Sequence, residues 1–266
     1  MSETARDDTS ETTIDDPSDG LFPESVAAGY DGPEGANTPE AIVPVVDVLA
    51  DLADGGPVLE LAIGTGRIAV PLAARGVPVS GIELSKAMAA RIGGKPGGGQ
   101  IDVTIGDMTT TLFDGAVAPG EFSLVYLVFN TIDNVTTQDG QVDVFRNAAA
   151  HLRPGGLFLV EVVIPGLRRM PPGQDTVPFT VAPDDGGGYV GFDRYDVATQ
   201  LYTSNHVTVT PDGGRFHVVP FRYAWPAEMD LMARIAGMRL KHRWADWDRA
   251  PFEHESTKQV SVWEKV

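Results

Sequence analysis

A glycine-rich turn and an acidic residue downstream of it are, by type and spacing, the residues best suited to hold a ligand. Gly64-Thr65-Gly66 follows an apolar run, and Glu83 ends a second apolar run 19 residues after Gly64. Glycine has no side chain and accepts unusual dihedral angles, so a ligand can approach the backbone of such a turn closely. An acidic side chain at this spacing can accept hydrogen bonds from ribose hydroxyls. The spacing therefore predicts a site for a ligand that contains ribose.

Glu60, just before the glycines, decides which ligand of this kind fits. Gly64 to Ala69 alone also matches the dinucleotide pattern G-x-G-x-x-G/A, which is typical of a nicotinamide-dependent oxidoreductase. A carboxylate at Glu60 would repel a pyrophosphate resting on a helix N-terminus. It suits a ligand with an ammonium group and a sulfonium cation, which S-adenosylmethionine presents. The alternative is that Glu60 pairs with a Lys or Arg at the end of a sheet.

Alternating strands and helices must position these residues. A helix is predicted from Thr38-Pro39-Glu40 to Gly55-Gly56, with Thr38 as its cap. The predicted strands are Pro57–Ile63, Val77–Leu84, Ile101–Ile105, Glu121–Phe129 and Gly156–Ile164, and the helices between them Arg67–Ala74, Lys86–Ile92 and Gln138–Leu152. This alternation predicts an α/β fold of the Rossmann-like kind, a mostly parallel sheet with helices on both faces. Ligands of such sheets bind beyond the carboxyl ends of the strands.

The alternation ends at Pro165. Three polar, alternating strands follow, with Pro211-Asp212-Gly213-Gly214 as a hairpin turn: Tyr189–Val197, Leu201–Thr210 and Arg215–Ala224. They predict a small antiparallel β insertion, which could be a lid or a dimer interface. A helix over Ala227–Ala236 and strands near Leu240–Trp247 and Lys258–Glu264 would then complete the first sheet, with the last strand antiparallel.

These patterns divide the chain into four parts. Residues 1–20 are acid-rich and lack an apolar segment, so we expect a disordered tail. Residues 21–165 form the predicted ligand-binding core, 166–225 the insertion, and 226–266 the C-terminal completion of the core sheet.

Composition limits the partners. The 266 residues carry a formal net charge of −17, which argues against binding to nucleic acid or to anionic membranes. No apolar run reaches the roughly 20 residues of a membrane-spanning helix. The chain has no cysteine, which excludes disulfides and thiolate chemistry, and no spacing of His and Asp indicates a metal site. A small molecule is the partner we expect, in a cytoplasmic protein.

From about Tyr30 to its end the sequence resembles the class I S-adenosylmethionine-dependent methyltransferases. Five segments match in order: Val58–Arg67, Gly81–Ser85, Gly106-Asp107-Met108, Phe122–Asn130 and Leu152–Gly156. Ala62 departs from the family, which most often has glycine there. Three later segments resemble small-molecule methyltransferases of bacterial secondary metabolism, including the sugar N-methyltransferase type: Arg222–Pro226, Trp244–Trp247 and Val260–Trp263.

The resemblance implies which residues hold S-adenosylmethionine. Glu60 and the Gly64–Gly66 backbone would hold its methionine part, and Glu83 its ribose hydroxyls. Asp107 would accept from the adenine amino group. Met88 would pack on the adenine ring or, alternatively, serve as a core residue of a helix. The full implied set is Tyr30, Glu60, Ala62, Gly64, Thr65, Gly66, Arg67, Glu83, Leu84, Met88, Gly106, Asp107, Met108, Phe129 and Asn130.

Methyl transfer from a sulfonium is an in-line displacement in which the protein supplies alignment, and no metal is required. A neutral amine needs no general base before attack, whereas an alcohol or phenol benefits from one. Asn130 is the residue expected to touch both cofactor and substrate. His206 shares a strand face with Tyr202 and Ser204 and is the candidate base if the insertion covers the cleft; otherwise it is a solvated strand histidine.

The candidate substrate-binding residues are Glu161, Arg222, Tyr223 and Trp225. Aromatic side chains can line an apolar pocket, although they serve equally well in packing. The function predicted is methyl transfer to an O, N or C nucleophile of a small molecule. The alternatives are a nicotinamide-dependent oxidoreductase, a non-catalytic binding protein and a protein-directed methyltransferase. A homodimer through the insertion is a further expectation.

Overall fold

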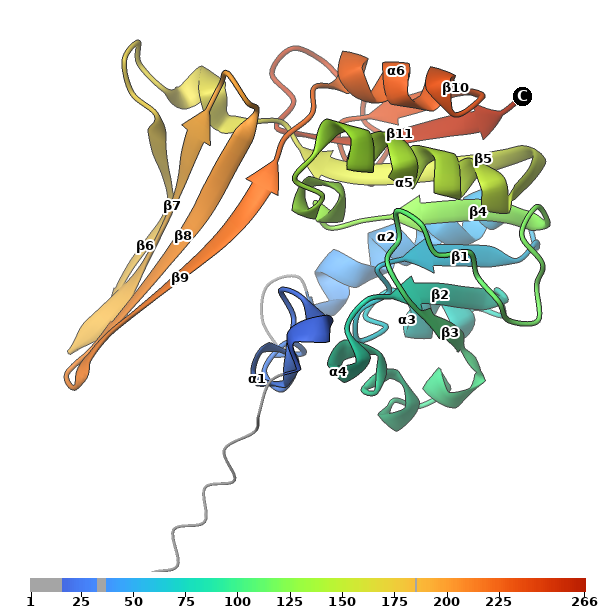
Figure 1. Cartoon of the computed structure of the whole chain (residues 1–266), viewed down its shortest axis with the longest axis horizontal. Coiled ribbons are helices and arrows are strands. Elements are labelled where there is room, and N and C mark those ends of the chain that lie inside the picture. Colours follow the sequence, from blue (N-terminus) through green and yellow to red (C-terminus); the bar gives the residue numbers. More distant parts are fainter. Residues whose placement is uncertain (1–15, 33–36, 185) are drawn as a thin grey trace, which may run out of the picture.

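Two β-sheets organise the chain, a large one covered by helices and a small one that stands to its side (Figure 1). The computed structural model describes residues 16–32, 37–184 and 186–266. The large sheet consists of β1 (Val58–Leu61), β2 (Val79–Glu83), β3 (Asp102–Ile105), β4 (Phe122–Leu127), β5 (Leu152–Val163), β10 (Met238–Trp244) and β11 (Lys258–Lys265). The small sheet consists of β6 (Thr176–Asp184), β7 (Gly187–Asp196), β8 (Leu201–Thr210) and β9 (Gly213–Arg222).

The strands of the large sheet lie in the order β10-β11-β5-β4-β1-β2-β3. Strands β1 to β5 pair in parallel, and β11 pairs antiparallel with both β5 and β10. Every residue of β1 and β4 is buried, because helices cover both faces of the sheet; such strands have continuous apolar sequences rather than alternating ones. The predicted mostly parallel sheet with an antiparallel last strand is confirmed.

Three of the described helices begin directly after a residue whose side chain caps the first turn. In α2 (Pro39–Ala53), Thr38 Oγ1 accepts from the N–H of Ala41 and Pro39 occupies the first turn. The other helices are α1 (Glu24–Ala27), α3 (Ala69–Ala73), α4 (Lys86–Ala89), α5 (Gln138–His151) and α6 (Pro226–Ile235), with 3-10 turns η1 (Pro17–Asp19), η3 (Ile92–Gly94), η4 (Gly98–Gln100), η5 (Thr131–Asn134) and η6 (Gly166–Arg169). Within the described ranges, no helix has the length and apolar character that crossing a bilayer requires.

The two faces of the large sheet bury separate cores. Beneath α5 and α6, which lie in front of the sheet in Figure 1, the ring of Phe145 packs edge-on against those of Phe158 and Trp263, at centroid distances of 5.0 and 5.2 Å. Beneath α2 and α3, on the other face, Leu49 and Leu72 are fully buried. Because successive residues of a strand point to opposite faces, Glu60 in β1 faces this second core.

The small sheet is the predicted β insertion, but it has four strands where the sequence predicts three. The additional strand is β6, which pairs antiparallel with β7 at the edge of the sheet. Pro178 and Pro183 made this segment unlike a strand, since proline lacks the N–H that a ladder needs. An edge position tolerates such residues, and the pairing is irregular between Pro178 and Thr180.

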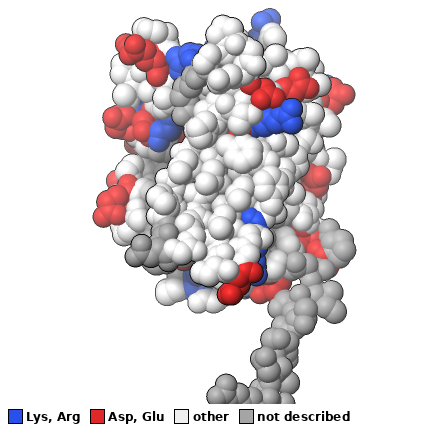
Figure 2. Space-filling model, turned by 90° about the vertical axis from the view of Figure 1, so that its left-hand side faces the viewer, with Lys and Arg blue, Asp and Glu red and all other residues white. Residues whose placement is uncertain are grey.

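The outer side of the insertion carries few charged side chains (Figure 2). Tyr195, Tyr202 and Tyr223 are buried on the inner face of the sheet. By strand pairing, Val209 and Phe216 belong to the opposite face, where they are 47% and 63% exposed. The chain has a net charge of −17, so two copies would repel each other least at this sparsely charged surface. The homodimer through the insertion stays a prediction.

The N-terminal segment differs from the predicted disordered tail over 1–20. Residues 1–15 lie outside the described residues, but Pro17–Asp19 forms η1 and the side chain of Asp19 is buried. Asp19 Oδ1 accepts from the N–H of Lys86 at 2.6 Å, so it satisfies a free donor in the first turn of α4. The segment Pro17–Asp19 is therefore structured, because Asp19 is hydrogen-bonded to the first turn of α4.

Candidate active site

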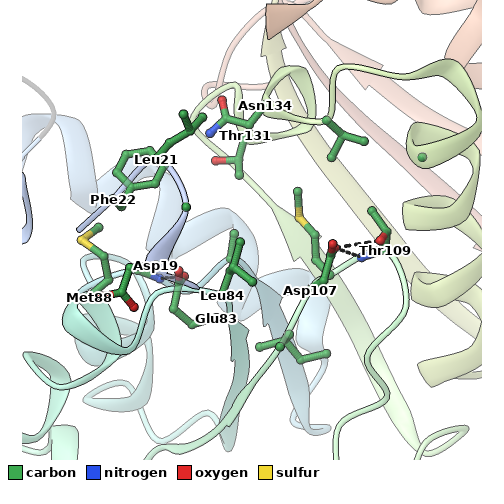
Figure 3. A pocket seen from close by; sticks show the side chains of 18 of the residues that line it. Asp19, Leu21, Phe22, Glu83, Leu84, Met88, Asp107, Thr109, Thr131 and Asn134 are labelled. Carbon is green, nitrogen blue, oxygen red and sulfur yellow. Dashed lines mark hydrogen bonds between the residues drawn. The ribbon is translucent and has the colours of Figure 1, made fainter. Parts of the chain in front are cut away.

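A cavity of about 460 Å³ opens at the carboxyl ends of β1, β2 and β3. Its floor comes from the residues that follow these strands, which include Ala62, Gly64, Glu83 and Asp107. Figure 3 shows Leu21 and Phe22 of the N-terminal segment on one side of the cavity and Asp107 and Thr109 on the other. The ligand site predicted at this edge of the sheet thus corresponds to an actual cavity, and the N-terminal segment forms part of its wall.

The turn after β1 has left-handed backbone at three positions. Gly64 and Gly66 have φ of 60° and 75°, and Ala62, where the family commonly has glycine, has φ of 52°. Glycine adopts such angles without the steric cost that a Cβ atom brings. The N–H of Gly64 donates to Glu83 Oε2 at 2.7 Å, which ties the turn to the end of β2.

Ala62→Gly is expected to stabilise the protein by about 0.5–1 kcal/mol. The left-handed conformation costs alanine about 1–2 kcal/mol, which glycine avoids. Glycine also gives the unfolded chain more conformational freedom, which offsets about 0.4–1 kcal/mol of this stabilisation. Urea unfolding of the two proteins measures the difference. A loss of stability in the variant would show that contacts of the alanine methyl outweigh the backbone cost.

Glu83 joins the ends of the first two strands. Besides Gly64, the N–H of Ser85 donates to Glu83 Oε1 at 2.9 Å, and the side chain lines the cavity. Burial raises the pKa of this carboxyl, while the hydrogen bonds from Ser85 and Gly64 oppose the rise. Its remaining acceptor capacity faces the space where a ligand would lie.

Glu60 lies behind the glycine turn rather than in the cavity wall. The hydroxyl of Tyr126 donates to Glu60 Oε2 at 2.8 Å, and the backbone of Ala69 at the start of α3 also bonds this carboxyl. Burial raises its pKa to about 8, although the Tyr126 hydrogen bond and the charge of Arg67 pull it down. Glu60 therefore links the end of β1 to β4 and to the start of α3.

The pH dependence of stability should reveal Glu60. Because its folded pKa of about 8 exceeds the ordinary 4.5, the folded protein keeps a proton that the unfolded chain releases as pH rises between these values. Stability must then fall over this window, by up to about 1.4 kcal/mol per pH unit. Glu60→Gln should flatten the fall, and urea unfolding at pH 5, 6, 7 and 8 measures it. Parallel curves for the two proteins would contradict the assignment.

The structure brings most of the predicted cofactor residues to the first cavity. Those that line it are Tyr30, Ala62, Gly64, Glu83, Leu84, Met88, Gly106, Asp107 and Met108. Met88 is also buried close to Gly64, as a core residue would be, and its packing on the adenine ring stays a prediction. The carboxylate of Asp107 accepts from the N–H and hydroxyl of Thr109 at 2.8 and 2.7 Å. Tyr30 packs edge-on against Phe22, at a centroid distance of 6.0 Å.

The other predicted cofactor residues lie behind or beside this cavity. Thr65 is buried and its hydroxyl donates to Asp31, and Gly66 packs close to Val70 and Ile92. Arg67 lies over the ring of Phe129, 4.5 Å from its centroid, and both line a second cavity together with Glu161.

Asn130 follows β4 with its side chain turned to the neighbouring strand. Its Oδ1 accepts from the N–H of Val163 at 2.7 Å, and its φ is 60°. Phe129 before it also has a left-handed φ, of 62°, and its N–H donates to Glu161 Oε2 at 2.6 Å. Asn130 and Glu161 together hold this unusual turn at the carboxyl ends of β4 and β5.

His206, Arg222, Tyr223 and Trp225 line neither of these two cavities in the described part of the chain. His206 lies within the insertion, where its ring nitrogens contact the hydroxyls of Tyr189 and Ser204. Tyr223 is buried in the tyrosine cluster of the insertion, with Trp225 edge-on to its ring.

Arg222 is buried at the base of the insertion. Its guanidinium donates to Gln141 of α5 and to Glu228 Oε1 of α6 at 2.7 Å. The side chain is 5% exposed. It therefore anchors the insertion to the core.

Sequence reasoning missed part of the cavity wall. Thr131 and Asn134 of η5 line the cavity, and the rule that ligands bind beyond strand ends could have found them, because they follow β4. Asp19, Leu21 and Phe22 also line it. Asp19 falls within the predicted acidic tail over 1–20, whereas Leu21 and Phe22 belong to the predicted core without a motif that marks them as a wall.

Comparison with known proteins places the chain in a family. The family described as "Methyltransferase domain" matches residues 58–156. The solved structure of the CcbJ methyltransferase from Streptomyces caelestis is 32% identical, with a TM-score of 0.79, and the match covers 91% of this chain and 96% of CcbJ.

Two curated proteins also match. The cypemycin N-terminal methyltransferase of a Streptomyces species is 26% identical over 224 residues, which are 80% of this chain and 84% of that protein. YqeM of Bacillus subtilis (strain 168) is 31% identical over 115 residues, and this match spans less than half of either chain, 42% and 44%.

The chain therefore belongs to the class I S-adenosylmethionine-dependent methyltransferases, and S-adenosylmethionine is its cofactor. This membership removes the nicotinamide-dependent oxidoreductase that the glycine pattern alone allowed. The first cavity fits the cofactor: it offers a buried carboxylate at Glu83, a further carboxylate at Asp107 and a side-chain-free approach at Gly64.

Proposed function

We propose that this enzyme methylates an amine nitrogen of a small molecule of the kind made in secondary metabolism. The observation that carries the proposal is the chemistry of the first cavity's wall. Among its described residues, the carboxylates of Asp19, Glu83 and Asp107 already accept hydrogen bonds from backbone N–H groups. Burial raises the pKa of Tyr30. Such a wall favours a nucleophile that needs no base for its attack, and a neutral amine is one.

S-adenosylmethionine supplies a methyl group already activated by its sulfonium. We propose that Glu83 accepts from the ribose hydroxyls, Asp107 from the adenine amino group, and that the Gly64–Gly66 turn holds the methionine part. Alignment of nucleophile and methyl group can lower the barrier by roughly 7–11 kcal/mol, so binding and orientation are the main tasks left to the chain.

The insertion is proposed as a lid on the acceptor side. The hydroxyl of Tyr202 in β8 donates to Asp133 Oδ2 at 3.0 Å, and Asp133 belongs to η5, whose neighbours Thr131 and Asn134 line the first cavity. A shift of the insertion would therefore pull on the wall of the cavity.

The name of one relative supports the proposal of an amine acceptor. The cypemycin N-terminal methyltransferase is named for transfer at an N-terminus. An N-terminal amine and the amine of a small molecule are chemically alike, so a short peptide belongs among the acceptors tested. The cavity volume of about 460 Å³ is that of a small-molecule site and favours the small molecule.

The test is a screen of acceptors with methyl-labelled S-adenosylmethionine, read by mass spectrometry of the products. Acceptors are used in matched pairs: an amino sugar and its parent sugar, a short peptide with a free and an acetylated N-terminus, an aliphatic amine and the corresponding alcohol. We expect label only in the amine member of a pair. Label confined to hydroxyl members would overturn the assignment of nitrogen.

A further inference from the structure

A second cavity, of about 430 Å³, lies between α2 and the carboxyl ends of β4 and β5. Among the described residues, none lines both this cavity and the first one. Its apolar surface includes Pro44, Ile68, Val128 and the largely buried Trp247. The cavity thus combines the size and the apolar walls of a site for a small organic molecule.

The stacked pair of Arg67 and Phe129 belongs to the wall of this second cavity. Gly64, three residues before Arg67, and Thr131, two residues after Phe129, line the first cavity. The loops after β1 and β4 therefore contribute to both cavities, which places the second one beside the proposed site of methyl transfer.

Charge in the second cavity is unbalanced. Its wall carries four carboxylates, Glu40, Glu161, Asp246 and Asp248, against the two cations Arg67 and Lys258. Lys258 Nζ lies 2.6 Å from Asp246 Oδ1, so these two charges form an ion pair. With all groups ionised the formal sum is 2 − 4 = −2, which favours a cationic ligand.

Glu161 is the carboxyl best placed to meet such a ligand. It comes from β5, and the Phe129 N–H holds one of its oxygens, so its orientation is fixed. Burial raises its pKa, which the hydrogen bond from Phe129 and the charge of Lys258 partly offset. A cation beside a buried carboxylate compensates the loss of water around both groups.

We propose that this second cavity binds a protonated aliphatic amino group of the methyl acceptor, with Glu161 as its ion-pair partner and the apolar wall around its carbon skeleton. This amino group is distinct from the nitrogen that is methylated, which reacts in its neutral form. The inference rests on the proposed function and assigns to this cavity recognition, not proton transfer. Aliphatic amines are protonated at neutral pH, with pKa near 10 as for lysine. A neutral hydroxyl or an anion of the same shape lacks this attraction.

Three probes of one shape and different charge test the proposal: cyclohexylamine, cyclohexanol and cyclohexanecarboxylate. Each is titrated at pH 7 into the ¹⁵N-labelled full chain without cofactor, and amide and indole shifts in two-dimensional NMR spectra give site and affinity. We expect cyclohexylamine to shift the Trp247 indole signal and to bind at least about tenfold more tightly than the other two. Equal affinity of the amine and the alcohol, or shifts elsewhere, would overturn the proposal.

Matched variants identify the partner. Glu161→Gln keeps an oxygen that can accept from Phe129, and removes only the charge. It should weaken cyclohexylamine binding about tenfold or more, as expected when a hydrogen bond to a charged group is lost. Glu121→Gln removes one exposed charge remote from the cavity wall and should leave the affinity within twofold. An unchanged affinity in Glu161→Gln, with Trp247 still shifting, would refute the role of Glu161.

Binding of S-adenosylhomocysteine, measured in parallel, separates this inference from the proposed function. If S-adenosylhomocysteine binds and cyclohexylamine does not, the second cavity is not the amine site and the proposed function stands. If amine acceptors remain unlabelled in the screen while cyclohexylamine binds beside Glu161, the proposed transfer fails and the site stands.

Discussion

Glu83→Ala is expected to raise the dissociation constant for S-adenosylmethionine about five- to 150-fold, which corresponds to about 1–3 kcal/mol. The buried carboxylate of Glu83 has backbone donors at Gly64 and Ser85 and faces the first cavity, where we propose that it accepts from the ribose hydroxyls. Alanine removes this charged acceptor and frees the N–H of Gly64, so both the direct contact and the shape of the glycine turn are affected. Isothermal titration calorimetry with S-adenosylmethionine measures the change.

Two comparisons make this result specific. Glu121→Ala removes an exposed carboxylate outside the cavity wall and should bind the cofactor as the parent does. Glu83→Gln keeps one accepting oxygen, so its loss should be smaller than that of Glu83→Ala. A folded Glu83→Ala protein with unchanged affinity would show that the ribose lies elsewhere.

The large sheet could be predicted because its information is local. The central strands β1 and β4 are short, fully buried runs, and α2, α4 and α5 begin directly after the side-chain caps Thr38, Ser85 and Thr137. β6 could not be predicted in this way, because Pro178 and Pro183 are acceptable only at an edge that the rest of the sheet creates. Asp19 is a similar case: its partner, the N–H of Lys86, is 67 residues away in the sequence.

In the candidate site, too, features set by local sequence could be predicted and contacts between distant segments could not. The cofactor residues that line the first cavity follow strand ends within single motifs, so their positions could be deduced from spacing and family resemblance. The hydrogen bond between Glu60 and Tyr126 could not be deduced in this way, since Tyr126 comes from another strand. His206 was assigned from its strand face and Arg222 from a segment that resembles the family. In the structure His206 contacts residues of the insertion itself, and Arg222 contacts α5 and α6.

Arg222→Ala is expected to lower the free energy of unfolding by about 3–5 kcal/mol, the usual cost of removing one partner of a buried ion pair. The guanidinium lies 2.7 Å from Glu228 Oε1 and also donates to Gln141, so it links the end of β9 to α5 and α6. Burial would raise the pKa of Glu228, but hydrogen bonds from Gln200 and Arg222 outweigh it and lower the pKa. Without Arg222 the buried carboxylate loses its cation. Urea unfolding at pH 7 measures the loss.

The double variant Arg222→Met, Glu228→Gln separates charge from packing. It removes both charges and keeps most of the volume, so it should regain a large part of the stability lost in Arg222→Ala. Arg239→Ala is the matched control: its ion pair with Glu264 is largely exposed on the arginine side, and exposed pairs contribute at most about 1 kcal/mol. If Arg222 instead bound substrate, Arg222→Ala would unfold like the parent and lose only acceptor affinity. Arg222 ties the insertion to α5 and α6, so we expect the opposite pattern, with stability falling first.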